Sequence, residues 1–225
     1  MIQSIIKETT PGIVQGLALQ YLVRAPKLKS NKQKAIILLH GVGSNEQDLF
    51  SFSNQLPADV YVISPRGPFT LGAGRYAWYN VDFSTGKPII NAAQEATSRE
   101  VIRTFINQIK QEYHVNEVYL GGFSQGAIMS YSIGLTHPAE VQGVVSLSGR
   151  ILDEIRPFVK KDAHLSKLKV LVAHGAQDNT LPIHYARAAK NFLESLGVQL
   201  TYHEYPIAHQ INNEVLQDLN NWLRS

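Results

Sequence analysis

Gly122-Phe123-Ser124-Gln125-Gly126 stands between an apolar run at 118–120 and a helix-like apolar pattern at 127–135. A strand, a sharp turn and a helix in this order form a nucleophile elbow, which raises a serine hydroxyl above a sheet. The turn would hold Ser124 at a positive φ, a strain of about 1–3 kcal/mol that the surrounding packing must offset. A G-x-S-x-G pattern alone is weak evidence. The strand and helix around it carry the prediction.

Short, β-branched and mostly apolar runs recur along the chain and predict strands that are covered on both faces. They lie at 35–39, 60–64, 118–120, 144–147, 170–173 and 200–205. Apolar residues at helical spacing alternate with them at 101–109, 186–196 and 215–223. This alternation predicts an α/β fold with a mostly parallel central sheet flanked by helices, whose ligands bind beyond the carboxyl ends of the strands.

The N-terminal part of the chain has a different pattern. Residues 17–23 alternate between apolar and polar, as in an edge strand, and residues 2–7 are expected to pair with them across the Pro11-Gly12 turn. The sequence therefore predicts short antiparallel strands at the start of an otherwise parallel sheet.

Composition limits the class of protein. With 225 residues, of which 44% are hydrophobic, the chain can bury one large core, so residues 1–225 are expected to form a single domain. There is no cysteine, which is compatible with a reducing compartment, and a formal charge of +3 is too small to indicate a nucleic-acid partner. We see no signal peptide or apolar run of membrane-spanning length, and expect a cytoplasmic protein that is a monomer or a weak homodimer.

The densest cluster of basic residues lies in one short segment. The cluster consists of Lys27, Lys29, Lys32 and Lys34, which lie among Pro26 and Ser30. We interpret it as a solvated loop before a strand, and a surface for an acidic partner is the less favoured alternative.

Ser124 needs a base and a carboxylate that orients the base, in the chain order Ser, Asp or Glu, His. Asp178 follows the strand at 170–173, and His209 follows the strand at 200–205. Both therefore lie where a parallel sheet places its ligands. The other downstream aspartates, Asp153, Asp162 and Asp218, are expected to be solvated surface charges.

The chain has eight histidines, and most of them have a structural interpretation. His40 and His174 precede glycines at strand ends, where a ring would support a loop through hydrogen bonds. His137 is expected near the end of a helix, and His203 within a strand. No metal-ligand spacing such as H-x-H or H-E-x-x-H supports a zinc site, so we expect no metal.

The oxyanion that forms on a carbonyl needs preorganised donors. The backbone N–H of Gln125, at the start of the helix after the elbow, is one candidate. Val42 is the other, because His40-Gly41-Val42-Gly43 follows an early strand and its glycines let amides turn inward. An ordinary glycine turn is the alternative for this loop.

These residues resemble the phospholipase/carboxylesterase family of small α/β-hydrolases, which includes carboxylesterases and acyl-protein thioesterases. The resemblance also rests on Pro65-Arg66-Gly67-Pro68, Ala77-Trp78-Tyr79, His174-Gly175-Ala176-Gln177-Asp178 and Ala208-His209-Gln210-Ile211. It implies an α/β-hydrolase fold with Ser124 as nucleophile, Asp178 as acid, His209 as base and the amides of Val42 and Gln125 as oxyanion donors. It implies no cofactor.

Residues 67–90 contain more aromatic side chains than an exposed connection needs. We expect this segment to form an apolar wall over the site, and a separate hydrophobic cluster without a ligand is the alternative. The candidate substrate-binding residues are Phe69, Leu71, Trp78, Tyr79 and Leu181. We expect segment 67–90 to favour a small or uncharged acyl ester over a phosphorylated one.

The sequence thus predicts a serine carboxylesterase that hydrolyses short- to medium-chain esters of small molecules through an acyl-enzyme. An acyl-protein thioesterase or lysophospholipase acting on longer chains is the alternative with the same chemistry. A non-catalytic α/β-hydrolase scaffold that binds a ligand is the alternative of another class.

Overall fold

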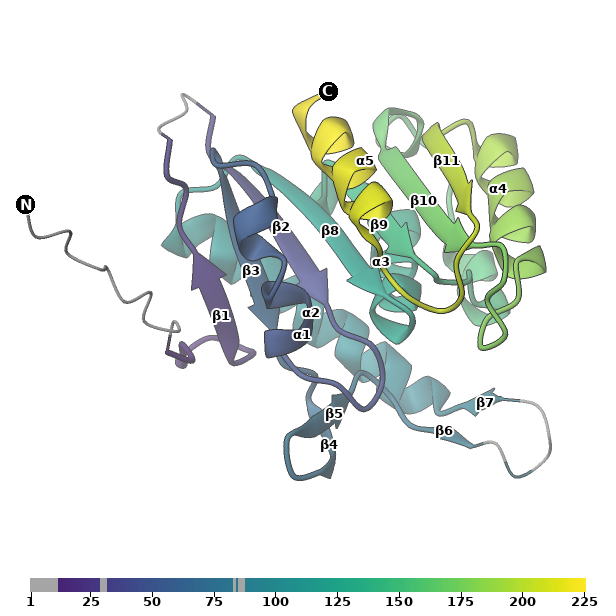
Figure 1. Ribbon diagram of the computed structural model, residues 1–225, viewed down its shortest axis with the longest axis horizontal. Helices are drawn as coiled ribbons and strands as arrows, with labels where there is room; N and C mark the ends of the chain where they lie inside the picture. The colour runs from purple at the N-terminus through teal and green to yellow at the C-terminus, as the bar shows by residue number, and fades with distance from the viewer. Residues whose placement is uncertain (1–11, 29–31, 83, 85–87) are drawn as a thin grey trace, which may run out of the picture.

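A computed structural model describes residues 12–28, 32–82, 84 and 88–225 of the chain, and its centre is a seven-stranded sheet (Figure 1). The strands are β1 (Tyr21–Arg24), β2 (Lys34–Leu39), β3 (Val60–Pro65), β8 (Glu117–Phe123), β9 (Gly143–Leu147), β10 (Lys169–Gly175) and β11 (Gln199–Tyr205). They are ordered β1-β3-β2-β8-β9-β10-β11. β1 runs antiparallel to β3, and the other neighbouring pairs are parallel.

Helices cover both faces of this sheet, as Figure 1 shows. They are α1 (Gln47–Phe50), α2 (Ala92–Glu112), α3 (Gln125–Thr136), α4 (His184–Leu196) and α5 (Asn213–Arg224), and four short 3-10 helices lie between them: η1 (Ser53–Gln55), η2 (Pro138–Glu140), η3 (Asp153–Phe158) and η4 (Leu165–Lys167). The core on one face joins side chains of the sheet to α2, α3 and α4. The core on the other face joins them to α1 and α5. This two-sided burial explains why the central strands are apolar throughout.

The mostly parallel sheet flanked by helices is therefore confirmed, and each predicted central strand is present. The predicted edge strand at 17–23 is present as the shorter β1. Its expected partner at 2–7 lies outside the described residues. Two small hairpins within 67–90 were not predicted: β4 (Phe69–Gly72) with β5 (Arg75–Ala77), and β6 (Val81–Asp82) with β7 (Ile89–Ile90).

The helix ends follow from local chemistry. The side chain of Asn91 accepts a hydrogen bond from the N–H of Gln94 and caps α2, and Asn212 caps α5 through the N–H of Val215. α4 ends at Gly197, whose φ of 75° is left-handed and suits a residue without Cβ.

The turn from β8 into α3 depends on an unusually close approach of backbones. A Cβ on Gly126 would lie 1.9 Å from the carbonyl oxygen of Leu39, at the end of β2, and a Cβ on Gly122 would lie 2.4 Å from the carbonyl carbon of Gly126. Ser124 between them has φ 53° and ψ −114°. The two glycines let α3 start directly on the sheet, and the positive φ predicted for Ser124 is confirmed.

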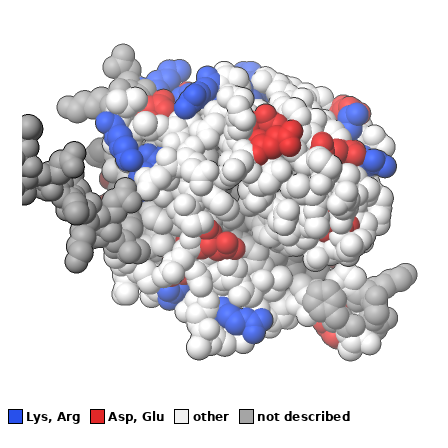
Figure 2. All heavy atoms as spheres, viewed as in Figure 1, with Lys and Arg blue, Asp and Glu red and all other residues white. Residues whose placement is uncertain are grey.

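Charge is dispersed over the described surface. Figure 2 shows one face, on which basic and acidic side chains are scattered over a mostly uncharged surface. In the lysine segment, Lys32 and Lys34 each lie within 4 Å of the Glu117 carboxylate, at 3.6 and 3.8 Å, while Lys29 lies outside the described residues. None of the helices in the described part of the chain has the length and apolar character needed to cross a membrane.

We predict that Gly126→Ala destabilises the protein by at least about 2 kcal/mol, because the new methyl group forces α3 away from β2. Urea unfolding followed by circular dichroism measures this. Gly12→Ala is the matched control, since its Cβ would meet nothing within 4 Å. Equal unfolding midpoints for the two variants would contradict the packing described for the elbow.

Candidate active site

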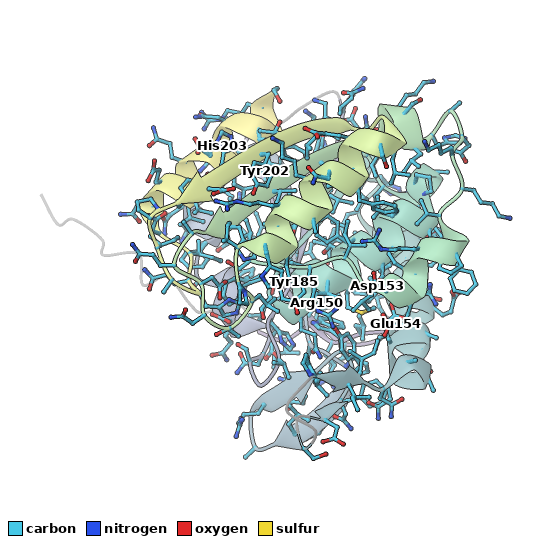
Figure 3. The ribbon with its side chains drawn as sticks, turned by 90° about the vertical axis from the view of Figure 1, so that its right-hand side faces the viewer. Arg150, Asp153, Glu154, Tyr185, Tyr202 and His203 are labelled. Carbon is cyan, nitrogen blue, oxygen red and sulfur yellow. The ribbon has the colours of Figure 1, made fainter. Side chains whose placement is uncertain are left out.

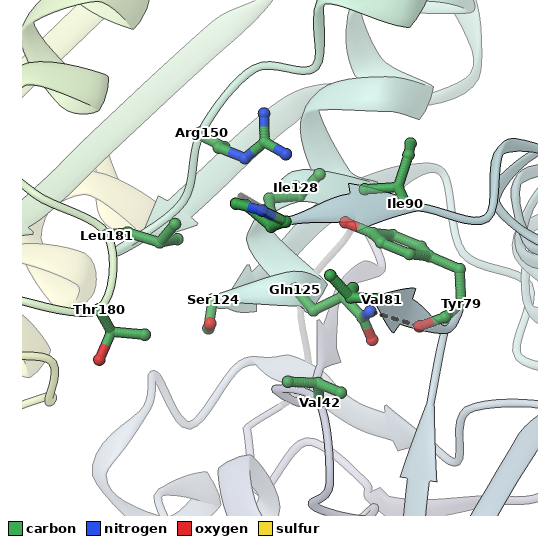
Figure 4. Close-up of a pocket in the computed structure, with 11 residues that line it drawn as sticks. Val42, Tyr79, Val81, Ile90, Ser124, Gln125, Ile128, Arg150, Thr180 and Leu181 are labelled. Atoms are coloured by element: carbon green, nitrogen blue, oxygen red, sulfur yellow. Dashed lines mark hydrogen bonds between the residues drawn. The ribbon is translucent and has the colours of Figure 1, made fainter. Parts of the chain in front are cut away.

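Ser124 lies at the carboxyl end of β8, on the turn into α3. Its N–H donates to the carbonyl of Leu147 (2.9 Å) and its carbonyl accepts from the N–H of Ile128 (3.1 Å). The backbone is thus bonded on both sides to β9 and α3. Ser124 helps to line a pocket, whose lining residues Figure 4 shows.

Asp178 and His209 are brought together from the loops after β10 and β11. The Nδ1 of His209 lies 2.6 Å from Oδ2 of Asp178. The other carboxylate oxygen accepts hydrogen bonds from the N–H groups of Thr180 and Leu181, both at 2.8 Å. The Asp178 side chain is fully buried, whereas 19% of the His209 side chain is exposed. The carboxylate is therefore fixed, and among the described residues Nε2 of His209 has no hydrogen-bond partner.

The two loops meet because Gly175, at the end of β10, has no side chain. A Cβ there would lie 2.3 Å from the carbonyl oxygen of Ile207 and 2.4 Å from that of Ala208. The N–H of Gln177 donates to the carbonyl of Ile207 at 3.0 Å. This close pairing of backbones brings His209 to Asp178, and the ring of His209 also packs on that of Phe123, with centroids 4.7 Å apart. Phe123 directly precedes Ser124.

His174 supports the loop after β10, which carries Asp178. Its Nε2 lies 2.7 Å from the carbonyl oxygen of Leu181 and 3.5 Å from the carboxylate of Asp178. Burial lowers the pKa of His174, so the ring is neutral and its Nε2–H donates to Leu181. The expectation that His174 supports a loop is confirmed.

His40 has the equivalent role after β2. Its Nε2 accepts from the N–H of Gly67 at 2.9 Å, so its Nδ1 carries the proton and donates to the carbonyl of Gly41 at 2.7 Å. Burial lowers the pKa of this ring as well. His40 thereby ties the loop after β2 to the start of segment 67–90, as predicted for a histidine at a strand end.

The backbone amides of Val42 and Gln125 both belong to residues that line the pocket. The neighbouring Gly43 has φ 78° and donates its own N–H to the carbonyl of Tyr76 (2.8 Å), which fixes the loop. Within the described part of the chain, the N–H groups of Val42 and Gln125 have no acceptor in the protein. Two such N–H donors beside a serine hydroxyl can stabilise the negative charge that develops on an oxyanion.

The side chain of Gln125 fixes the wall of the pocket. Its Oε1 accepts from the N–H of Trp78 at 2.9 Å, and its Nε2 donates to the carbonyl of Tyr79 at 2.7 Å (Figure 4). The indole N–H of Trp78 donates to the carbonyl of His40 at 2.9 Å. The residue that starts α3 therefore also holds the bend at 78–79 that follows β5.

The pocket has a volume of about 530 Å³, its open mouth included. Its described lining consists of Val42, Tyr79, Val81, Pro88, Ile90, Ser124, Gln125, Ile128, Arg150, Thr180 and Leu181. Tyr79 and Leu181 thus line it, as expected of substrate-binding residues, and the end of segment 67–90 forms part of the wall. Five of these residues were not singled out from the sequence: Pro88, Ile90, Ile128, Arg150 and Thr180.

Phe69, Leu71 and Trp78 do not belong to this lining, which departs from the expectation for them. Phe69 and Leu71 lie on β4, in a hairpin apart from the pocket, and Leu71 is 41% exposed. Trp78 is fully buried, with its ring 5.2 Å from that of His40. Its indole fills the core behind the wall, so it supports Tyr79 instead of facing a ligand.

A strand-end rule could have identified one of the missed residues. Arg150 comes three residues after Leu147, the last residue of β9, just as Asp178 follows β10. The search for residues after strands had covered only candidate bases and acids, so Arg150 was not considered.

Among the described residues, no group of three His, Cys, Asp or Glu side chains is placed to hold a metal ion.

Comparison with known sequences identifies relatives along nearly the whole chain. The model of the family described as Phospholipase/Carboxylesterase matches residues 22–225. An acyl-protein thioesterase 1 of Emericella nidulans is 26% identical over 220 residues, covering 88% of this chain and 92% of that protein. The carboxylesterase SOBER1 of Arabidopsis thaliana is 25% identical over 202 residues, covering 84% and 89%.

Solved structures share the fold. A carboxylesterase from Mesorhizobium loti superposes with a TM-score of 0.82 at 20% identity, over 96% of this chain and 99% of that one. The Zea mays acyl-protein thioesterase 2 gives a TM-score of 0.76 at 19% identity, over 91% and 97%. The α/β-hydrolase fold expected from the sequence is thus confirmed.

The buried histidines predict how stability depends on pH. Because burial lowers the pKa of His40 and His174 in the folded state, the unfolded state takes up protons first, near its ordinary pKa of about 6.5. Their contribution is complete above that pH and is lost as the pH falls below it. The slope is at most about 1.4 kcal/mol per pH unit for each histidine.

Unfolding free energies measured from pH 7.5 down to about 5 test this. His174→Gln keeps an N–H donor for Leu181 but does not titrate, so the slope should become shallower than in the wild type. His164→Gln, at an exposed position, is the control for removing a histidine. A His174→Gln slope equal to that of the wild type would show that this ring does not contribute.

Proposed function

Because this chain belongs to the phospholipase/carboxylesterase family, we propose that Ser124, Asp178 and His209 form its catalytic triad and hydrolyse carboxylic esters through an acyl-enzyme. The family supports esterase or thioesterase activity, and the residue roles are our assignment. The observation that carries the assignment is the 2.6 Å contact between His209 Nδ1 and Asp178 Oδ2. With Nδ1–H donated to the carboxylate, Nε2 keeps its lone pair and can accept a proton from a serine.

In the first half of the reaction, Oγ of Ser124 attacks the ester carbonyl carbon while its proton passes to Nε2 of His209. The carbonyl oxygen becomes an oxyanion, which the N–H groups of Val42 and Gln125 stabilise. Losing one such donor typically costs about 3–4 kcal/mol of transition-state stabilisation. The tetrahedral intermediate then collapses as His209 returns the proton to the leaving alkoxide, which departs as the alcohol.

In the second half, a water molecule attacks the acyl carbon and gives a proton to His209. The new tetrahedral intermediate breaks its bond to Oγ, and Ser124 regains the proton. The products are a carboxylic acid and the free enzyme. The buried Asp178 stabilises the imidazolium that forms twice in the cycle, and no cofactor takes part in these steps.

A short- to medium-chain acyl group is the substrate class we propose. Most of the walls of the pocket beside Ser124 are apolar, which suits a hydrocarbon chain. Acyl-protein thioesterases among the relatives support a second candidate, a thioester or lysophospholipid with a longer chain. Rates measured over a series of acyl lengths separate the two, since the first candidate requires activity to fall as the chain outgrows the pocket.

Ser124→Ala should lower the turnover of short-chain aryl esters by about 10⁴-fold or more in a protein that stays folded. A fluorophosphonate probe should label the wild type at Ser124 and leave the variant unlabelled. Ser166→Ala, at an exposed position, is the control and should keep both activity and labelling. Undiminished hydrolysis by Ser124→Ala would exclude the mechanism, and failure of the wild type to react would favour a non-catalytic binding scaffold.

Asp178→Asn tests the orienting carboxylate. Asn can still accept from the N–H groups of Thr180 and Leu181, but its amide N–H₂ then faces Nδ1 of His209 and moves the ring proton to Nε2. We expect kcat to fall by about 10⁴-fold with little loss of stability. Asp153→Asn, on the exposed start of η3, is the control. Equal turnover in the two variants would remove Asp178 from the triad.

The single domain, the cytoplasmic location and the monomeric or weakly dimeric state remain predictions. Light scattering over a range of protein concentrations tests the last of these.

A further inference from the structure

Arg150 places a cation in a pocket whose other walls are largely apolar. It follows β9 and lines the same pocket as Ser124, together with Val81, Ile90, Ile128 and Leu181. In Figure 4 its guanidinium lies on the far side of the pocket from Val42. An arginine stays charged at all relevant pH values, so it gives this end of the pocket a permanent positive charge.

The guanidinium of Arg150 has no carboxylate partner in the described part of the chain. No acidic oxygen lies within 4 Å, and it donates no hydrogen bond there. Its contact is with the ring of Tyr185, 5.7 Å from the guanidinium carbon to the centroid, and Figure 3 shows the two side by side. Asp153 on the following η3 is paired with Arg156 at 2.9 Å. The five N–H donors of Arg150 are thus available to a ligand.

A second donor lies at the same end of the pocket. Tyr79 is 1% exposed, and within the described residues its hydroxyl makes no hydrogen bond. Figure 4 shows that hydroxyl pointing into the pocket, toward the side of Arg150. Burial raises the pKa of Tyr79, the charge of Arg150 opposes the rise, and the carboxylates of Glu95 and Glu154 add to it, so the hydroxyl lies within electrostatic reach of all three charged groups. The phenol keeps its proton and can donate it in a hydrogen bond.

The position of His209 identifies which half of an ester enters this pocket. The leaving alcohol takes its proton from Nε2 of His209 and must lie beside that ring. His209 does not belong to the described lining, whereas Ser124 and both proposed oxyanion residues do. The pocket therefore receives the acyl half of the ester.

We propose that the acyl group carries an anion, such as a terminal carboxylate, which Arg150 and the hydroxyl of Tyr79 bind at the far end of the pocket. The preferred substrates are then monoesters of dicarboxylic acids, and the inference rests on the proposed esterase function. A planar carboxylate matches the fork of a guanidinium, and the apolar walls suit the methylene chain between the two ends. This departs from the uncharged acyl ester that segment 67–90 favours, because the charge comes from a distant part of the chain.

The test compares matched pairs of methyl esters. One series is the monomethyl esters of straight-chain dicarboxylic acids from succinic to suberic acid. In the other, a methyl ketone replaces each free carboxylate, so that length and shape are kept without the charge. We expect the wild type to prefer the anionic ester, by kcat/KM, about 10- to 100-fold at the best length, as for a charge-assisted hydrogen bond in a partly buried site.

Variants assign this preference to Arg150. Arg150→Met keeps the length of the side chain without its charge and should bring the ratio of anionic to neutral ester near one. Arg150→Lys should keep part of the ratio, and Tyr79→Phe should lower it less than Arg150→Met. Arg224→Met, at an exposed position in the last turn of α5, removes a cation outside the pocket lining and is the control that should keep the wild-type ratio.

A binding measurement separates this inference from the proposed function. Titration calorimetry of monomethyl glutarate with the Ser124→Ala protein needs no turnover, and binding should be lost when Arg150→Met is added. Absence of ester hydrolysis with binding intact would overturn the proposed function alone. A wild-type ratio near one at all lengths, or an Arg150→Met ratio equal to that of the wild type, would overturn the inference. A preference only for acetoxypropanoate would also overturn the inference, because in this acetate ester the carboxylate belongs to the alcohol half of the substrate.

Discussion

The first turn of α3 packs directly on the carboxyl end of β2, and the site is built around this contact. Side chains at Gly122 or Gly126 would overlap backbone atoms, so the approach is possible only because both are glycines. The contact sets the abrupt turn at Ser124 and places the start of α3 beside the loop that follows β2. The amides of Val42 and Gln125 therefore lie next to the serine by virtue of backbone packing.

The same contact organises the wall of the pocket. Gln125 begins α3, and its side chain bonds the backbone of Trp78 and Tyr79. His40, at the end of β2, bonds Gly67 and packs on Trp78. Segment 67–90 is thus held at its start by the residue that follows β2 and in its middle by the residue that begins α3. A pocket wall supported in this way is preorganised, which a catalytic site requires.

Sequence patterns were most informative where the chemistry is local. Parallel strands appeared as short apolar runs, and the rule that ligands lie after strands selected Asp178 and His209 correctly as neighbours. Aromatic content alone was a poor guide to lining residues. Trp78 turns its indole into the core, and Phe69 lies on a hairpin outside the pocket lining. The direction of a side chain in such an irregular segment depends on what packs behind it, which the sequence pattern does not reveal.

The amino-acid sequence by itself determines the parallel sheet, the elbow and the order of serine, acid and histidine along the chain. Each follows from spacing, strand propensity or the missing Cβ of glycine, and these act over a few neighbouring residues. Only the folded structure decided the contact of Asp178 with His209, the direction of the Trp78 indole away from the pocket and the presence of Arg150 in the same pocket lining as Tyr79. Those features join segments far apart in sequence, and the shared packing of sheet, helices and loops sets their distances.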